Sequence, residues 1–191
     1  TDIGMLYNGN APDLGAFESG GSVTYTLTVN TIHGTVTKNP NRFLYDSGMT
    51  VQLTASPAVG YHFLNWTGDT SGSMNPISII MDNNKMITAN FAINQYALTI
   101  NAANGTVVKI PDNMVYDSGA AVLLTALPAQ GYHFVDWSGD VIGSINPITI
   151  LMNNDKTIDA NFAINQYTIT IDVANGNVVK NPNQTLYDSG S

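Results

Sequence analysis

Apolar and polar residues alternate with a period of two over short segments, which are separated by clusters of Gly, Pro, Asn, Asp and Ser. Segments 25–29 and 51–55 each alternate apolar residues with Thr or Gln. This alternation is typical of a strand that buries one face. Similar segments occur around Val36 and over 61–66, 77–81 and 87–91. Helical spacing is missing and β-branched residues dominate, so the sequence predicts an all-β fold with about six short strands per unit.

The pattern repeats with a period of 71 residues. Tyr25, Tyr96 and Tyr167 open the same phrase, and later Gly, Pro, Tyr, Trp and Phe positions stay in phase. The first two copies share 42 identical positions out of 71, with no insertion. A fixed period of this kind indicates tandem modules. The predicted layout is a tail from an upstream domain (1–23), two complete modules (24–94 and 95–165) and a partial third module (166–191).

Turn residues divide each module. Tyr45-Asp46-Ser47-Gly48 predicts a turn that recurs in each copy, and Asn104-Gly105 accepts the positive φ angles of a tight hairpin. No Gly- or Ser-rich linker separates Asn94 from Gln95, so we expect little hinge motion there. We therefore expect elongated, serially stacked modules, each adding about 30 Å to the length.

The partial third module predicts two strands without their usual cover. Segments 167–171 and 177–180 match the first strands of a complete module, but nothing after them matches 120–165. This segment either frays, docks on the second repeat, or pairs with another chain by strand addition. Because a lone two-stranded hairpin is marginal in water, we expect pairing with another chain wherever the segment is ordered.

Charge and composition exclude several classes of protein. Only 10% of residues are charged and the net charge is -8, so the six Lys and Arg cannot build the basic face of a nucleic-acid binder. No apolar run is long enough to span a bilayer, and we expect no membrane insertion. Cysteine is absent, which excludes disulfides and thiolate chemistry. The chain opens at Thr1 without Met, and we expect a piece of a longer secreted precursor.

One phrase carries a family resemblance. Residues 60–91 contain Gly60-Tyr61, Trp66, Gly68-Asp69, Asn75-Pro76 and a terminal Phe91, and residues 131–162 repeat all of them. The phrase resembles the divergent B-repeats of internalin-type bacterial surface proteins. The resemblance covers 24–191 and implies small β-rich modules related to a β-grasp fold. It also implies a stalk, spacer or adhesive role at the cell surface, with no shared catalytic residues.

The tail carries a second resemblance. Segments 2–4 and 11–18 look like the C-terminal end of right-handed parallel β-helix proteins of the pectate-lyase type. This resemblance implies a β-helix domain, of a polysaccharide-processing kind, upstream of the repeats.

Aromatic residues of the 61–66 strand are the candidate ligand-binding residues. Exposed Tyr61, Trp66, Tyr132 and Trp137 would stack on sugar rings. Buried, the same residues would fill a small core, and core packing is the interpretation we favour for Phe63 and Trp66. The exposure of the two Trp residues distinguishes these alternatives.

Other candidate chemistry is weaker. Asp69 and Asp140 recur in loops and are candidate calcium ligands, although the acids are sparse for a calcium cage. His62 and His133 recur once per module and form no ligand cluster, so we expect no catalytic site, no metal and no cofactor.

These observations favour a non-enzymatic tandem β-repeat segment of a secreted or surface-bound bacterial protein. It would act as a stalk or as an adhesive module that self-associates, up to fibre formation. Its expected partners are neighbouring repeats and other copies of the chain. The alternative is a carbohydrate-binding appendage to a β-helix enzyme, with an extracellular glycan as partner.

Overall fold

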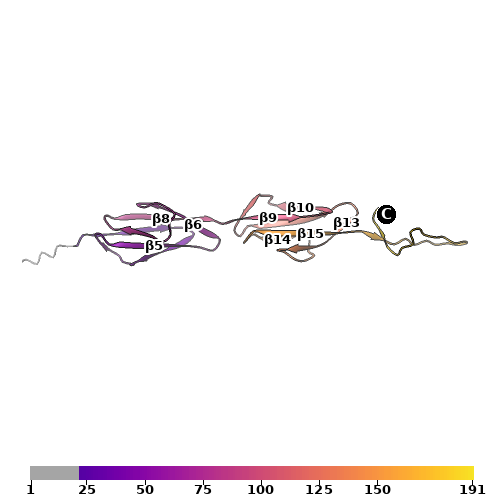
Figure 1. Ribbon diagram of the computed structural model, residues 1–191, viewed down its shortest axis with the longest axis horizontal. Coiled ribbons are helices and arrows are strands. Elements are labelled where there is room, and N and C mark those ends of the chain that lie inside the picture. Colours follow the sequence, from indigo (N-terminus) through magenta and orange to yellow (C-terminus); the bar gives the residue numbers. More distant parts are fainter. Residues whose placement is uncertain (1–21) are drawn as a thin grey trace, which may run out of the picture. The chain divides into compact units, whose positions relative to one another are not determined.

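The structure is a computed structural model that describes residues 22–191 (Figure 1). The chain divides into two compact units between Ala92 and Ile93. The predicted tail 1–23, and with it the β-helix resemblance, lies almost entirely outside the described residues. Within the described part, every regular element is a β-strand, which confirms the all-β prediction. The described residues contain no helix that could cross a membrane.

The first unit contains a complete module with eight strands. They are β1 (Thr24–Tyr25), β2 (Leu27–Thr31), β3 (Gly34–Asn39), β4 (Tyr45–Asp46), β5 (Thr50–Pro57), β6 (Tyr61–Gly68), β7 (Ile77–Ile80) and β8 (Lys85–Ile93). One sheet has the order β2-β8-β6, a second has the order β3-β5-β7, and β1 pairs with β4. The second sheet is antiparallel, whereas β2 and β8 run parallel to each other.

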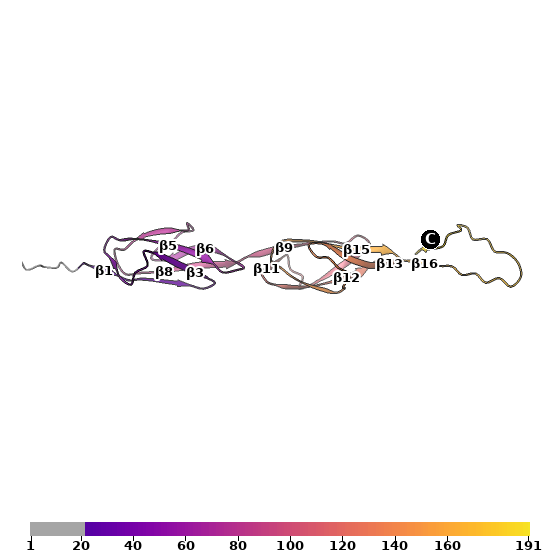
Figure 2. The same ribbon diagram turned by 90° about the horizontal axis from the view of Figure 1, so that it is seen from below.

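The inward faces of both sheets form one core. The alternation predicted for 51–55 appears directly, since Val51 and Leu53 are fully buried while Gln52 is exposed. Their side chains join Trp66 of β6 and Ile87 of β8 in a single hydrophobic cluster. The strands that carry these residues are labelled in Figures 1 and 2. Burial of alternate residues on two sheets is therefore what holds the module together.

The second unit repeats this architecture with seven strands. They are β9 (Gln95–Asn101), β10 (Gly105–Ile110), β11 (Val115–Asp117), β12 (Ala121–Pro128), β13 (Tyr132–Gly139), β14 (Ile148–Leu151) and β15 (Lys156–Ile164). β9 is continuous where the first unit has β1 and β2, so its sheet reads β11-β9-β15-β13. The other sheet reads β10-β12-β14. The core again centres on a tryptophan, Trp137.

The structure adds short strands that the sequence analysis did not predict. Residues 45–46 were expected in a turn, but they form β4 and pair with β1. Tyr45 is completely buried, and placing its ring in the core draws the backbone alongside Tyr25. These two-residue strands raise the number per module above the predicted six.

The partial third module departs further from expectation. Its only strands are β16 (Gln166–Tyr167) and β17 (Tyr187–Asp188), which pair with each other. The predicted strands over 167–171 and 177–180 do not form beyond Tyr167. In the second unit the equivalent strands pair with β15 and β12, and residues 166–191 contain no counterpart of either. Without those partners the backbone has no ladder to join.

Candidate functional site

Trp66 and Trp137 lie inside their modules. Trp66 is 0% exposed and Trp137 is 1% exposed. Each indole Nε1 donates a hydrogen bond of 2.9 Å to a loop carbonyl, that of Met74 or Ile145. Neither ring therefore offers a face on which a sugar could stack. The structure places both in the core, as the favoured interpretation of Trp66 held.

The loop above each indole is anchored by an asparagine. The Asn75 side chain accepts from the backbone N–H of Ala55 at 2.9 Å and donates to the carbonyl of the same residue at 2.8 Å. Asn146 makes the same pair of bonds with Ala126 at 2.9 and 2.8 Å. One amide thus pairs with the strand as a neighbouring backbone would. This is the structural role of the repeated Asn-Pro phrase.

Tyr61 and Tyr132 are partly buried. Tyr61 stacks flat on His33, with ring centroids 4.3 Å apart and planes 5° apart. Asn104 replaces His33 in the second module, and both of these residues have a φ of 66°. The stacked pair is thus particular to the first module. The sequence analysis placed His33 in a turn without a counterpart and did not bring it to Tyr61.

The candidate calcium ligands serve the backbone instead. The Asp69 carboxylate accepts the N–H of Met86 at 2.7 Å, and that of Asp140 accepts the N–H of Thr157 at 2.6 Å. Both bonds tie a loop to the last strand of the module. Among the described residues, no group of three or more His, Cys, Asp or Glu side chains is placed to hold a metal ion.

His62 and His133 occupy equivalent, exposed positions. The Nδ1 atom of His133 lies 2.8 Å from Oδ1 of Asn165. This contact joins the aromatic strand to the end of its own module and involves no carboxylate.

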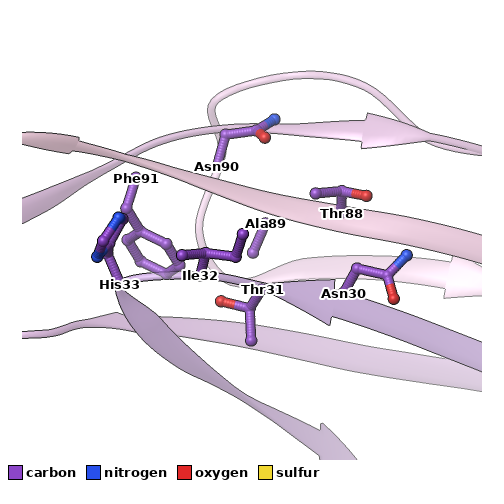
Figure 3. Close-up of a pocket in the computed structure, with 8 residues that line it drawn as sticks. All are labelled: Asn30, Thr31, Ile32, His33, Thr88, Ala89, Asn90 and Phe91. Atoms are coloured by element: carbon purple, nitrogen blue, oxygen red, sulfur yellow. The ribbon is translucent and has the colours of Figure 1, made fainter.

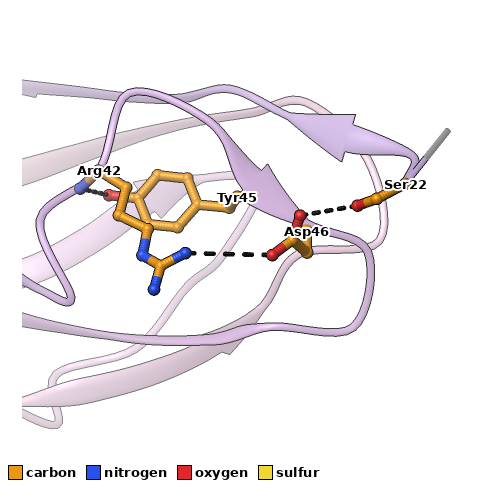
Figure 4. A network of polar contacts seen from close by, with 4 residues as sticks. All are labelled: Ser22, Arg42, Tyr45 and Asp46. Carbon is orange, nitrogen blue, oxygen red and sulfur yellow. Dashed lines mark hydrogen bonds and ion pairs between the residues drawn. The ribbon is translucent and has the colours of Figure 1, made fainter. Parts of the chain in front are cut away.

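A second tyrosine organises a loop in each repeat. The Tyr45 hydroxyl donates to the Pro40 carbonyl and accepts from the Arg42 N–H, both at 3.2 Å. Asp46 beside it receives a hydrogen bond of 2.7 Å from Ser22 and lies 4.0 Å from the Arg42 guanidinium (Figure 4). Tyr116 and Tyr187 bind their own proline carbonyls in the same way. The motif predicted as a turn is therefore a loop anchor.

A hollow lies at the same place in both modules, beside the turn between the first long strands. In the first module it holds about 260 Å³ and is lined by Asn30, Thr31, Ile32, His33, Thr88, Ala89, Asn90 and Phe91 (Figure 3). In the second it holds about 270 Å³ and is lined by Asn101, Ala103, Asn104, Asp159, Ala160, Asn161 and Phe162. Every position of the second set lies 71 residues after a position of the first.

The first hollow is lined by neutral residues. The Asn90 amide donates to Asn65 Oδ1 at 2.8 Å and to Thr67 Oγ1 at 3.0 Å. Phe91 packs over Gly34, where an added Cβ atom would lie 2.5 Å from its ring. The hollow thus combines an aromatic wall with fixed amides, the groups that bind neutral polar ligands.

The second hollow carries carboxylates at the corresponding positions. The Asn161 amide donates to Asp136 Oδ1 at 2.7 Å, and the Asn101 amide donates to Asp159 Oδ1 at 2.7 Å. Asp136 and Asp159 replace Asn65 and Thr88 of the first module. The two hollows therefore share a shape and differ in charge.

The geometry defines a class of protein: a tandem repeat of all-β modules whose recurrent polar residues fasten loops to strands. A family model for the divergent InlB B-repeat domain matches residues 25–95 and 96–166. The chain belongs to this family, which confirms the resemblance found in its sequence. Domains of this family are typical of bacterial surface proteins. A search of curated proteins found no matching relative. The β-helix resemblance of the tail is not supported by any match.

Proposed function

We propose that the chain is a non-enzymatic spacer of a bacterial surface protein that also associates with other copies of itself. The tandem B-repeat domains support the repeat-module part of this proposal. The spacer role, the association and the lack of catalysis are our inference.

One observation carries the proposal: the recurrent polar side chains are engaged in holding the modules together. Asp69 binds a backbone N–H, Asn75 binds both polar groups of Ala55, and the Trp66 indole binds a loop carbonyl. Each of these contacts recurs in the second module. What the repeat preserves between its two copies is thus a folded shape, which is what a spacer needs.

Small-angle scattering of the full chain tests the spacer role. We expect the maximum dimension to correspond to modules placed end to end, with about 30 Å contributed by each. A scattering curve typical of one compact particle would overturn the spacer proposal.

Association is supported by the apolar residues of the third module. Tyr167, Ile169 and Ile171 are 55%, 50% and 43% exposed, whereas Leu98, which matches Ile169, packs against the core of the second module. A second copy of the chain is the occupant that strand addition would supply.

Light scattering on the full chain and on Ile169→Ser/Ile171→Ser tests the association. We expect the mass of the unsubstituted chain to rise with concentration and that of the variant to stay monomeric. Thr168→Ser/Thr170→Ser is the matched control, because it changes the same strand without removing apolar surface. A monomeric unsubstituted chain at high concentration would overturn the association.

The second candidate function is binding of an extracellular glycan, which the hollow of the first module favours. Its fixed amides and the stacked Tyr61–His33 pair provide hydrogen bonds and a flat aromatic surface. This site differs from the one expected from sequence, since it does not use Trp66. Glycan-array binding that is lost in Asn30→Ala and kept in Thr28→Ala would support it. No binding by the unsubstituted chain would exclude it.

A further inference from the structure

The first and last long strands of each module lie side by side and run in the same direction. In the first module β2 pairs with β8 over five residue pairs, from Leu27 with Lys85 to Thr31 with Ala89. In the second module β9 pairs with β15 over four, from Leu98 with Lys156 to Asp159 with Asn101. The strand where the chain enters the module is thus bonded directly to the strand where it leaves.

Parallel pairing fixes how tension between the two ends of a module acts on these bonds. Tension draws β2 toward its N-terminus and β8 toward its C-terminus, so the strands are pulled in opposite directions along their own axes. All pairs are then loaded at once. Separation requires several hydrogen bonds to break together, whereas peeling the strands from one end would break them singly.

Side chains lengthen this ladder at the end where it is loaded. The Asn84 carbonyl oxygen accepts the backbone N–H of Thr26 at 2.9 Å, one position beyond the first pair. The carboxylate of Asp155, the matching residue, accepts the N–H of Ala97 at 2.8 Å. The side chain thus adds one more backbone contact at the entry end of each ladder.

The core protects the same strands from water. Leu27 is 6% exposed, Ile87 is 0% exposed and Ala89 is 2% exposed, so the inward face of the pairing is dry. Water therefore reaches these hydrogen bonds from one side only. A bond shielded in this way is harder for solvent to replace during separation.

We propose that the parallel pairs β2–β8 and β9–β15 act as force-bearing clamps that keep each module folded under tension along the chain. The inference deepens the spacer function proposed above and rests on it, because a spacer between a cell and its surroundings carries load. Resistance to forced unfolding is a property of the unfolding rate, which pulling measures directly.

The test is single-molecule pulling of the full chain in two geometries. The chain lacks cysteine, so engineered thiols give unique attachment points. Handles at Val23→Cys and Ser191→Cys load both clamps in shear. Handles at Val23→Cys and Asn154→Cys still shear the first module, but they pull the second from two points at the same end of its clamp. Asn154 lies in the exposed turn just before β15.

In the second geometry we expect the second module to open at a force lower by roughly two- to fourfold, because four pairs share the load in shear and one bears it during peeling. The first module serves as the reference in the same molecule and should keep its force. The length of chain released identifies which module has opened.

Handles at Val23→Cys and Asn83→Cys provide the reciprocal variant, since they peel the first module, and they serve if the Asn154 variant fails to fold. Equal unfolding forces in the two geometries would overturn the clamp. That outcome would leave the spacer proposal intact, because the scattering experiment depends on folded length alone. A compact particle in scattering together with direction-dependent forces would instead reject the spacer and keep the clamp.

Discussion

At Asn75 a side-chain amide replaces a strand. The end of β5 would otherwise leave both polar groups of Ala55 without a partner on that side, and the amide satisfies the two together. The adjacent carbonyl of Met74 receives the indole of Trp66, so the loop and the core residue are fastened at neighbouring positions.

Replacing this amide should destabilise the first module. Asn75→Ala removes two hydrogen bonds and leaves the part-buried groups of Ala55 unpaired, at a cost of about 2–4 kcal/mol. Asn75→Asp is the control, because it keeps the acceptor and loses the donor, and we expect a loss between the two. Urea unfolding monitored by Trp66 fluorescence measures the change. A midpoint equal to that of the unsubstituted chain would show that the amide contributes nothing.

Single residues were predicted unevenly from the sequence. Burial of Trp66 followed from strand alternation and from the need to fill a small core. The partner of Asn75 did not, because it lies 20 residues away on another strand. The hollow and the His33–Tyr61 pair were also missed, since they depend on which strand ends meet in space. The shared period of Gly34 and Phe91 was the one available signal for the hollow.

Among the elements, the turn before the last strand differs between modules. In the first, Lys85 lies 2.6 Å from the carboxylate of Asp82. The hydrogen bond from Lys85 lowers the pKa of Asp82 below its ordinary value of 3.8. Asn153 takes the place of Asp82 in the second module and does not titrate.

Acid should therefore affect this turn in one module only. A carboxyl whose pKa is lower in the folded state stabilises that state above its unfolded pKa, and it loses this contribution as the pH falls through the folded value. We expect the Asp82 carboxyl to titrate below pH 3.8 in an NMR titration of the full chain. Asp82→Asn should remove the acid sensitivity of the turn and make it resemble the second module. A midpoint above 3.8 would contradict the ion pair.

Residues 166–191 form one contact with the second module and little sheet. The N–H of Ser189 donates to the carbonyl of Asn165 at 2.8 Å, and an added Cβ at Gly131 would lie 2.8 Å from the Ser189 hydroxyl. Gln166 also donates to Asp188 at 2.8 Å. The end of this segment is thus held on the preceding module, while its middle has no ladder.

Hydrogen exchange should show this division. In dilute solution we expect the amide of Ser189 to be protected and the amides of 169–180 to exchange rapidly, because only the former has a backbone acceptor. Protection of 169–180 that appears as concentration rises would support pairing between chains. Rapid exchange at Ser189 would show that β16 and β17 do not stay paired.

Strand positions in complete modules were largely predictable, since alternation and turn residues coincide there. The strands of 166–191 were not, because alternation gives a tendency and pairing decides whether a strand forms. The short strand β4 was missed for the same reason, as its partner β1 lies 21 residues away.

At the scale of the whole molecule, each compact unit has its own core. The clusters around Trp66 and Trp137 share no residue. The family and the all-β fold were both predictable from the period, because a repeated phrase fixes many positions at once.

Separate cores predict independent responses to substitution. Trp66→Ala and Trp137→Ala should each cost roughly 3–5 kcal/mol, as truncation of a large buried aromatic does. The double variant should show the sum, because sites without shared partners add. Unfolding in urea, followed by circular dichroism, measures all three. Strong non-additivity would show that the two cores are energetically coupled.

The loop held by Tyr187 has a consequence for how the chain is made. Its hydroxyl bonds the Pro182 carbonyl at 2.8 Å and the Gln184 N–H at 3.3 Å, so the loop closes within six residues. Short closures form fastest, because they lose the least chain entropy. On a ribosome, this loop can therefore form as soon as Tyr187 emerges, and Ser189 then meets the carbonyl of Asn165 on a module that is already complete. Each finished repeat is in this way a template for the start of the next, and a long array folds in the order in which it is synthesised.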